Sequence, residues 1–538
     1  MIVQLDHASY FTSYQYYDLY DDLKTEIIKE ANKHLDKNIK KEKISSINSE
    51  RFKKRTGIDP ILKSQKNPEF PDIYFNPEFC ISHAGVLAEI CISRALKQNY
   101  EPVPALRMMI DKPGGGQRPV EKFSIVDAAF EKVIFRRVRQ RNLDRFSKHS
   151  YAYHPKKSRS DAIRALFAFQ PRHGSFAVQI DFKDFFATIP HSYLISELES
   201  ENYTVDEIEK NVIKAFISHR YAEPDDYNAS NFYHRAQGVP QGATISLLLA
   251  NIACNQLDHS IVPISDFYAR YADDTLVICN NFADAWRVVA RIEAFCNCSG
   301  ITINRKKSQE ISIIGDVNED VPQIKGIEFL GYRFENGKLL LSDSTVRRLK
   351  KHISRIVHLH LLHYLKHGVA RNRCGSFPYT YDWDLVTLIN ELRRFIYGGI
   401  SEEDIKAAIQ GEVGFKSMRS IMSSYHLINN ASQLKELDGF VVNIVRRAMS
   451  RRKKLLEKFG FTCPSVSNRQ LISGNWFDRH AWRKGQPLDL RLPSFVRAWQ
   501  AAYRFHENGS GSSNSDADML AYDNDVSDIE NIDDYDNI

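Results

Sequence analysis

The chain has 538 residues, of which 43% are hydrophobic and 26% charged, and its formal net charge is +6. This length exceeds one ordinary domain and fits about two to four packed subdomains. No apolar run approaches the ~20 residues that a membrane-spanning helix needs, and the acidic, tyrosine-rich N-terminus does not resemble a signal peptide. We therefore predict a cytoplasmic protein that does not enter membranes.

The positive charge is concentrated before residue 507. Residues 507–538 contain ten acids and no lysine or arginine, so setting them aside raises the net charge from +6 to +16 on residues 1–506. A basic body favours a polyanionic partner, because lysine and arginine release counterions from phosphates. The final segment is rich in Gly, Ser, Asn and Asp, and we predict that it is a disordered acidic tail.

The first half of the chain begins with helices. Residues 1–100 are predicted to be mostly helical, and a turn-rich basic segment follows at 107–120. The pattern of 124–144 predicts a helix with Ser124 as its N-cap. Residues 176–190 should begin as a buried strand and then turn into a helix.

The second half combines strands with further helices. Residues 246–261 are typical of a buried helix, and 266–280 of a hairpin with an acidic centre. An amphipathic helix is expected over 283–298, followed by two short strand candidates, ITIN and IEFLGYRF, and then by a basic helical region over about 344–500. The eight cysteines form no C-x-x-C pair, so we expect reduced core cysteines and no zinc site.

Three aspartates stand at the ends of apolar runs. Asp273 and Asp274 lie between FYAR and TLVIC, and Asp181 ends the run AVQI. An Asp-Asp pair in a solvated turn is the alternative for the tetrapeptide YADD alone. The apolar flanks instead place these acids at a sheet edge, where three carboxylates supply the hard oxygen ligands of two Mg²⁺ ions, with Mn²⁺ as an alternative. The sequence thus predicts a two-metal site for in-line phosphoryl transfer.

The motifs around these aspartates resemble those of reverse transcriptases. YADD resembles the Y-x-D-D core of that family, and IDFKDFFATIPH resembles its first carboxylate motif, with Asp181 in the metal position. QGVPQGATISLLLANIACNQLD resembles the next glycine-rich loop and helix. ITINRKKS resembles the lysine-bearing motif, with Lys307 at its usual place, and FLGYRF resembles the strand that grips the primer. KPGGGQRPVEKFSIVDAAFEKVI resembles the fingers motifs of bacterial members, so the similarity spans roughly residues 105–335.

The resemblance implies an α+β right-hand polymerase with an antiparallel palm sheet and a helical thumb. We expect five regions: a helical N-terminal region (1–100), fingers (101–175), palm (176–340, with a fingers insertion at about 195–235), thumb and helical C-terminal extension (341–506), and the acidic tail (507–538).

The resemblance also implies roles in nucleotide binding. Arg118 would clamp triphosphate oxygens, and Phe186 would exclude a 2′-hydroxyl and so select dNTPs. Gln241 and Gly242 would let the backbone approach the nucleotide, and Lys307 would neutralise or protonate the pyrophosphate. The alternatives are a surface arginine, a core aromatic, a plain turn and a solvated lysine. We interpret Asp184 as a helix-start residue and not as a metal ligand.

A dense basic stretch in the predicted thumb is a candidate nucleic-acid contact. The alternative is a solvated helix face. Its members are Arg446, Arg447, Arg451, Arg452, Lys453 and Lys454.

The motif sequences are typical of bacterial reverse transcriptases. Together with the long helical extension, they most resemble the defence-associated reverse transcriptases of the antiviral and abortive-infection type. Some of these act without a template, start DNA on a protein hydroxyl, bind a structured non-coding RNA or form homo-oligomers. The N-terminal tyrosines Tyr10, Tyr14, Tyr16, Tyr17 and Tyr20 are candidate primers, with helix or interface aromatics as the alternative.

Three other functions are alternatives. A retron or group II intron-like retroelement enzyme stays open, although neither the retron thumb motif nor a Cys/His endonuclease pattern is clearly found. A catalytically silent RNA-binding scaffold would fit the loss of an aspartate, but all three are present. A metal-dependent nuclease would not explain the other motifs. The implied partners are an RNA template, dNTPs and a DNA product.

Overall fold

The structure is a computed structural model of the chain. It describes residues 13–56, 70–111, 116–305, 308–315, 321–366, 382–412, 414–415, 417–460, 465–476 and 489–507. Lys307, Tyr10 and the tail from 508 onward lie outside the described residues.

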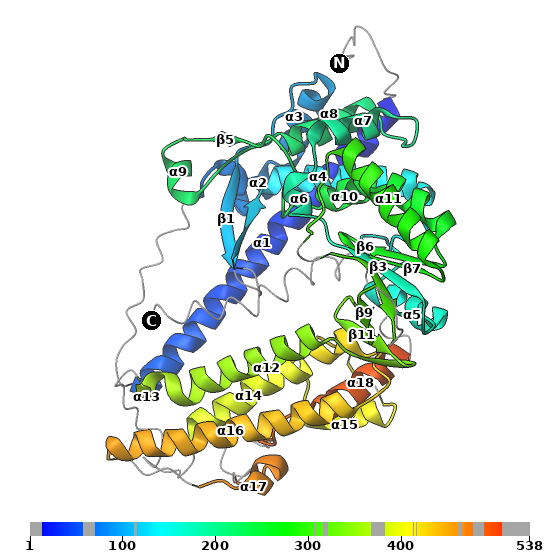
Figure 1. The fold of residues 1–538 in the computed structure, drawn as a ribbon. Helices are drawn as coiled ribbons and strands as arrows, with labels where there is room; N and C mark the ends of the chain where they lie inside the picture. Colours follow the sequence, from blue (N-terminus) through cyan, green and yellow to red (C-terminus); the bar gives the residue numbers. More distant parts are fainter. Residues whose placement is uncertain are drawn as a thin grey trace.

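The N-terminal region is helical, as its apolar periodicity predicts. The long helix α1 (Ser13–Thr56) packs its first half against α2 (Pro77–Ser82), α3 (Ala84–Leu96) and α4 (Ile125–Asn142) (Figure 1). A single 3-10 turn, Ile73–Phe75, precedes α2. Ser124 caps α4 by accepting a hydrogen bond from the Asp127 backbone N–H, so the predicted N-cap is confirmed.

The predicted turn-rich segment is a β-hairpin. Strands β1 (Ala105–Asp111) and β2 (Gln117–Lys122) pair antiparallel. They belong to a four-stranded sheet in the order β2-β1-β4-β5, which β4 (Arg220–Ala222) and β5 (Tyr233–His234) complete. The sequence did not predict these strands because β2 has no apolar pattern. Only one of its six residues, Glu121, is buried, and that residue is charged.

A five-stranded sheet forms the centre of the molecule, in the order β6-β7-β3-β8-β9. All neighbours pair antiparallel except β8 with β9. Its strands are β3 (Phe176–Ile180), β6 (Phe267–Tyr271), β7 (Asp274–Cys279), β8 (Gln309–Ile314) and β9 (Gln323–Ile324).

Both faces of this sheet are covered, which explains why its strands are apolar throughout. Side chains alternate between two hydrophobic cores: Val277 and Cys279 of β7 join one core, and Leu276 and Ile278 join the other. The first core includes α10 (Ile245–Ile261) and α11 (Phe282–Ser299), and the second includes α5 (Arg159–Phe169). The predicted buried helix and amphipathic helix are therefore confirmed.

The remaining elements of this region are short. Helix α6 follows β3, and its bounds are Phe185–Thr188. The insertion between α6 and α10 contains α7 (His191–Glu199), α8 (Glu207–Ile217) and α9 (Pro224–Asn228). The strand prediction for ITIN is wrong, because Ile303 makes only an isolated bridge to Phe182.

IEFLGYRF divides into two strands at a tight turn. The antiparallel sheet β10 (Ile327–Phe329), β11 (Tyr332–Glu335) and β12 (Lys338–Leu341) begins here. Leu330 and Gly331 between β10 and β11 both have positive φ, at 49° and 77°. The side chain of Gln179 on β3 donates a hydrogen bond to the Glu328 carbonyl of β10 at 2.6 Å, which joins this sheet to the central sheet.

The C-terminal region is helical and basic, as predicted. Helices α12 (Asp343–His358), α14 (Trp383–Tyr397) and α16 (Ser432–Lys458) lie side by side in the lower part of Figure 1. The smaller helices are the π-helix Leu359–His363, α13 (Tyr364–Lys366), α15 (Glu402–Ile409), α17 (Asn468–Ser473) and α18 (Phe495–Glu507).

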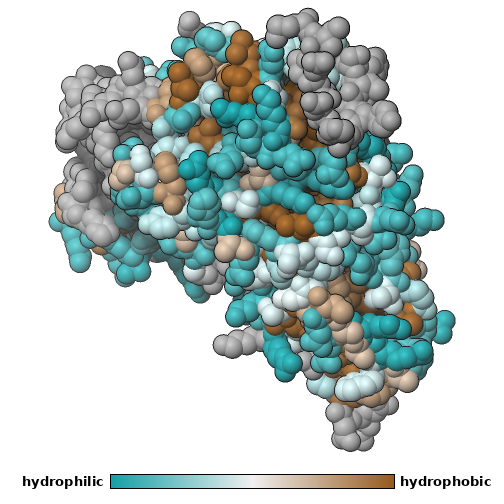
Figure 2. Space-filling model, turned by 90° about the horizontal axis from the view of Figure 1, so that it is seen from above, coloured by the Kyte–Doolittle hydropathy of each residue, from teal (hydrophilic) through white to brown (hydrophobic). Residues whose placement is uncertain are grey.

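No helix among the described residues is both long and apolar enough to cross a membrane. The face drawn in Figure 2 is mainly hydrophilic, with several separate hydrophobic patches. Helices mixed with a mainly antiparallel central sheet agree with the predicted α+β class. The boundaries of the five predicted regions stay predictions.

Candidate active site

The three predicted aspartates lie at one end of the central sheet. Asp181 directly follows β3, and Asp274 begins β7. Because Ile180 pairs with Thr275 in the antiparallel register, the next positions, Asp181 and Asp274, are neighbours across the two strands. Asp273 sits in the two-residue turn between β6 and β7, where Ala272 has a φ of 57°.

The electrostatics of Asp274 reflect this convergence. The pKa of the Asp274 carboxyl is raised to about 7, mainly by burial and also by the charges of Asp273 and Asp181. A hydrogen bond from the Leu330 backbone acts in the opposite direction. Asp181 accepts a hydrogen bond from Asn304 Nδ2 at 3.0 Å, and its backbone N–H donates to Ser308 Oγ at 3.1 Å. The loops before β8 and after β10 therefore contribute to the same site.

The donor set fits divalent cations. Among the described residues, no three His, Cys, Asp or Glu side chains form a ready-made metal cluster. However, three carboxylates that repel one another at a strand end are hard oxygen donors, and cations between them would remove the repulsion. Asp181, Asp273 and Asp274 are thus the residues that would hold Mg²⁺ or Mn²⁺, together with substrate phosphates and water. Asp184 is the N-cap residue of α6, as interpreted from the sequence, although its side chain makes no cap hydrogen bond.

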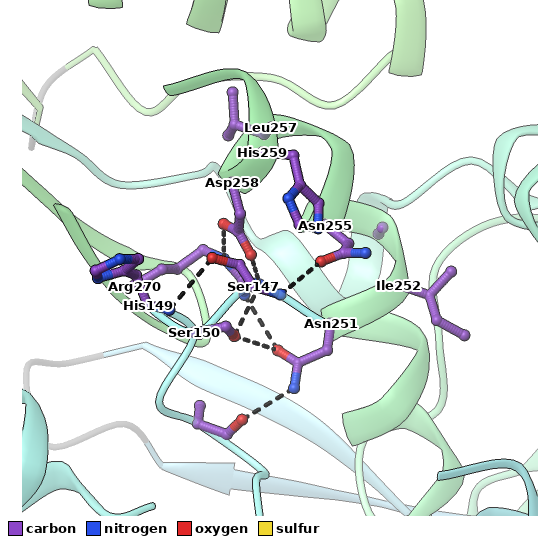
Figure 3. A network of polar contacts seen from close by, with 12 residues as sticks. Ser147, His149, Ser150, Asn251, Ile252, Asn255, Leu257, Asp258, His259 and Arg270 are labelled. Atoms are coloured by element: carbon purple, nitrogen blue, oxygen red, sulfur yellow. Dashed lines mark hydrogen bonds and ion pairs between the residues drawn. The ribbon is translucent and has the colours of Figure 1, made fainter. Parts of the chain in front are cut away.

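A buried polar network supports the turn that carries Asp273 (Figure 3). Arg270 of β6 is fully buried and binds both carboxylate oxygens of Asp258 on α10, at 2.7 and 2.6 Å. The same guanidinium donates to the Ala272 carbonyl at 3.0 Å and to Ser150 Oγ at 3.0 Å. Asn251 of α10 accepts from Arg270 at 3.2 Å. The turn is therefore tied through one side chain to the core helix behind it.

Sequence reasoning missed this network, although a signal existed. Arg270 interrupts the apolar run of β6, and Asp258 lies on a helix that the sequence predicts to be buried. Buried charges are rare unless they are paired, so an arginine in a buried strand and an aspartate in a buried helix are candidates for one ion pair.

The glycine-rich loop approaches β2 more closely than the sequence indicated. Gly242 has a φ of 118°, and a Cβ there would lie 2.4 Å from the Glu121 carbonyl oxygen. The Glu121 backbone N–H also donates to the Gln241 carbonyl at 2.7 Å. Gly242 is exposed and Gln241 half-buried. The small residue is needed here because two protein backbones meet, whatever nucleotide binds nearby.

The side chain of Glu121 stabilises that contact between β2 and the glycine-rich loop. Its carboxylate is buried and pairs with Arg107, Arg235 and His219. Burial alone would raise the pKa of Glu121, but the nearby His219 ring, the charge of Arg235 and the hydrogen bonds that Arg107 donates lower it to about 2. Strand β2 is thereby fixed against the segment that leads into the glycine-rich loop.

Helix α10 begins on a buried carboxylate. Glu131 of α4 accepts hydrogen bonds from the backbone N–H groups of Thr244 at 3.0 Å and Ile245 at 2.6 Å. A carboxylate at this position satisfies orphan donors and favours the positive end of the helix dipole. Burial nevertheless raises the pKa of Glu131 to about 7.

This pKa predicts a pH dependence of stability. The folded state binds the Glu131 proton more tightly than the unfolded state, whose pKa is near 4.5. Its contribution to stability is therefore largest below about pH 4.5 and is lost as pH rises to about 7. The Glu131→Gln variant should lack this slope, so the stability difference between it and the wild type should change by on the order of 2 kcal/mol between pH 5 and pH 8. Denaturant unfolding at both pH values tests this, and equal slopes would contradict it.

The predicted nucleotide-binding residues lie on separate elements. Arg118 is half-buried on β2 and pairs with Ile110 across the hairpin. Phe186 is half-buried in α6, with its ring at 5.8 Å from that of Phe185 in an edge-to-face contact. Its carbonyl accepts from the Val239 N–H at 2.6 Å, which joins α6 to the glycine-rich loop. Their roles stay predictions, and Lys307 lies outside the described residues.

The basic stretch of α16 needs one correction. Arg446, Arg447, Arg451, Lys453 and Lys454 are exposed. Arg452 is instead only 2% exposed, and it binds Asp382 at 3.0 Å and Asp384 at 2.7 Å. The prediction that Arg452 contacts nucleic acid is therefore wrong, because its charge is used to join α16 to the start of α14. The other five remain candidates.

A mixed fold whose central antiparallel strands end in three converging carboxylates defines the class of right-hand nucleic-acid polymerases. Residues 110–334 match the model of the family described as reverse transcriptase (RNA-dependent DNA polymerase). The chain thus contains a reverse transcriptase domain, and the predicted fold class is confirmed.

The chain is also similar to individual proteins. It is 22% identical to the uncharacterized 91 kDa protein in cob intron of Schizosaccharomyces pombe, over 48% of this chain and 40% of that protein. It is 25% identical to the protein YkfC of Escherichia coli, over 37% of this chain and 51% of that protein. The matches thus span about half or less of these relatives. A telomerase of Candida albicans, solved with a fragment of telomeric RNA, aligns with a TM-score of 0.36 and 12% identity over 71% of each chain.

Proposed function

We propose that this protein is an RNA-directed DNA polymerase that joins dNTPs by in-line phosphoryl transfer at Asp181, Asp273 and Asp274. One observation carries the proposal: the register of β3 with β7 and the β6–β7 turn bring the three carboxylates together at a strand end. The match of residues 110–334 to the reverse transcriptase family supports it.

The chain's own residues would position the reactants. When bound, a pair of Mg²⁺ ions supplies activation of the primer 3′-hydroxyl and charge neutralisation of the pyrophosphate. Asp181, Asp273 and Asp274 would hold these ions. The Arg270 network fixes the turn that carries Asp273. Arg118 on β2 would hold triphosphate oxygens with its planar fork, and Lys307 would act on the pyrophosphate.

The test is incorporation of labelled nucleotides by the purified chain with Mg²⁺, first on a primed RNA template and then without added template. We expect dNTP incorporation that depends on the three aspartates. Label that stays attached to protein until protease treatment would add protein priming. Tight RNA binding with no incorporation under any condition would overturn the polymerase proposal in favour of a silent scaffold.

Phe186 provides a prediction on substrate choice. Its ring is half-buried at the start of α6, five residues after Asp181, and we propose that it closes the space a ribose 2′-hydroxyl would occupy. Phe186→Val should therefore raise kcat/KM for NTPs relative to dNTPs by roughly tenfold or more, because a missing steric contact is worth about 1–3 kcal/mol. The matched control is Phe185→Leu, a change at the fully buried neighbour. An unchanged ratio for Phe186→Val would contradict the role.

For the biological role we propose bacterial antiviral defence in the cytoplasm. The support is the large helical C-terminal region, α12 to α18, which shares one hydrophobic core with β10–β12, α5 and one face of the central sheet. A retroelement polymerase is the second candidate, because one relative is named for its place in a cob intron. Phage challenge of bacteria that carry the wild-type or the Asp273→Asn gene separates the two: aspartate-dependent protection supports defence, and equal phage yields contradict it.

A further inference from the structure

Helix α1 changes its surroundings at its midpoint. In the first half, Leu19, Leu23, Ile27 and Ala31 recur every four residues and are buried. Acidic side chains on this half meet basic residues of α4: Asp22 pairs with Arg137 at 3.0 Å, Glu26 with Arg136 at 2.6 Å and Glu30 with Lys132 at 2.8 Å. Packing and charge together therefore fix residues 18–31 on the body of the molecule.

The second half extends from that body. Every residue from 36 to 47 is exposed, and Figure 1 shows this part running from the upper helices toward the lower helical group. At 1.5 Å per residue, the twelve exposed positions alone make a rod of about 18 Å. A helix this exposed gains little from tertiary packing, which is the usual source of helical stability in proteins.

The exposed half is basic on one side. Lys33, Lys37 and Lys41 recur every four residues and so form one line along the helix. Lys40 and Lys43 flank this line. The opposite side carries Ile39, Glu42 and Ser46, and Asp36 lies one turn before Lys40.

The basic line also acts on a cation outside α1. Desolvation lowers the pKa of Lys122, the last residue of β2, and the charges of Lys37 and Lys41 lower it further. Lys122 also contributes to the lowered pKa of His34, about 4. Lys37, Lys40, Lys41 and Lys43 make no ion pair with another described residue. Asp36 and Glu42 lie among these lysines but form no ion pair with them, unlike the acids of the first half of α1.

We propose that the basic line of α1, Lys37 and Lys41, binds the phosphate backbone of a nucleic-acid duplex. Regularly spaced lysines on a straight helix can contact several phosphates of a repeating backbone. Each such contact releases counterions and so favours binding. Residues 36–47 include no aromatic side chain for base stacking, which single-strand binders use. The surface lies outside the reverse transcriptase domain, so this binding goes beyond the proposed polymerase function.

A second copy of the chain is the other occupant to consider. Ile44 and Ile47 are 56% and 41% exposed on the lysine side of α1 and could pack in a helix pair. Two copies meeting through this side would, however, bring their lysine rows together, and like charges across an interface are costly. Charge complementarity therefore favours the polyanion.

Fluorescence anisotropy of the full chain tests the proposal with three labelled probes of one sequence: an RNA duplex, an RNA–DNA hybrid and single-stranded RNA. Lys37→Ala/Lys41→Ala should weaken duplex binding by on the order of tenfold and reduce the slope of log Kd against log salt by about 2. If the double variant binds only the RNA duplex more weakly, the ligand of this surface is structured RNA. If it binds both duplexes more weakly, the RNA–DNA hybrid made by the polymerase is also a ligand. Alanine preserves helix propensity, which circular dichroism can verify.

The matched control is Lys97→Ala/Lys406→Ala. It removes two exposed lysines, one at the C-terminal end of α3 and one in α15, and so changes the net charge by the same amount. It should leave the salt slope within error of the wild type. Equal weakening by both double variants would overturn the proposal, since only overall charge would then matter. Weakening confined to single strands, or a wild-type dimer in light scattering that the α1 variant dissociates, would also overturn it. Binding does not require catalysis, so all outcomes can be read in an Asp273→Asn background.

Discussion

Asp273→Asn and Asp274→Asn should each lower dNTP incorporation by roughly a thousandfold or more. Losing one carboxylate ligand forfeits several kcal/mol of charge stabilisation in the transition state, and about 4 kcal/mol corresponds to a thousandfold in rate. Asparagine keeps the size of the side chain and the β6–β7 turn. Initial rates over a range of Mg²⁺ and Mn²⁺ concentrations measure the effect.

The same variants should not be less stable. Asp274 is buried beside two other carboxylates that repel its charge, so the neutral amide of Asp274→Asn should raise the melting temperature in metal-free buffer. The matched control is Asp184→Asn, three residues after Asp181, which should retain activity within a few fold because Asp184 begins α6 and is not proposed as a ligand. Near-normal incorporation by Asp273→Asn or Asp274→Asn would contradict the assignment of the site.

Arg270→Met should destabilise the protein by about 3–5 kcal/mol, because the change leaves Asp258 buried without its cation. Arg270 and Asp258 are both fully buried, and four groups share the guanidinium: Asp258, Asn251, Ser150 and the Ala272 carbonyl. Methionine has a similar length but donates no hydrogen bond. Denaturant unfolding measures the loss in free energy of unfolding.

The network also predicts a loss of activity below the unfolding temperature. Without the donor to Ala272, the turn that carries Asp273 loses its link to α10, so kcat should fall more than KM rises. Asp258→Asn/Arg270→Met should recover part of the stability but not of kcat. The control is Arg287→Met on α11, whose side chain is 63% exposed and whose ion pair with Asp284 should contribute little. A loss below about 1 kcal/mol for Arg270→Met would contradict the role of the network.

The sequence by itself determined the local elements and the chemistry that they can carry. Continuous apolar runs predicted β3 and the β6–β7 hairpin, because strands covered on both faces are apolar throughout, and the patterns of 246–261 and 283–298 predicted α10 and α11. The ordered motifs also predicted Asp181, Asp273 and Asp274 as the metal-binding residues. Their convergence follows from the antiparallel register, which a hairpin and a neighbouring strand make probable but do not fix.

Only the tertiary structure decided what each polar residue contacts. Arg452 belongs to a basic stretch by sequence, yet it is buried because Asp382 and Asp384, about seventy positions earlier, lie beside it. Gly242 reads as a loop residue, but its neighbour is the Glu121 carbonyl of a distant strand. Likewise, α1 has lysines in one continuous pattern, and only packing shows which half is covered. Partners this far apart in sequence leave no periodic trace, because a local pattern reports the face a residue lies on and not the group that it meets.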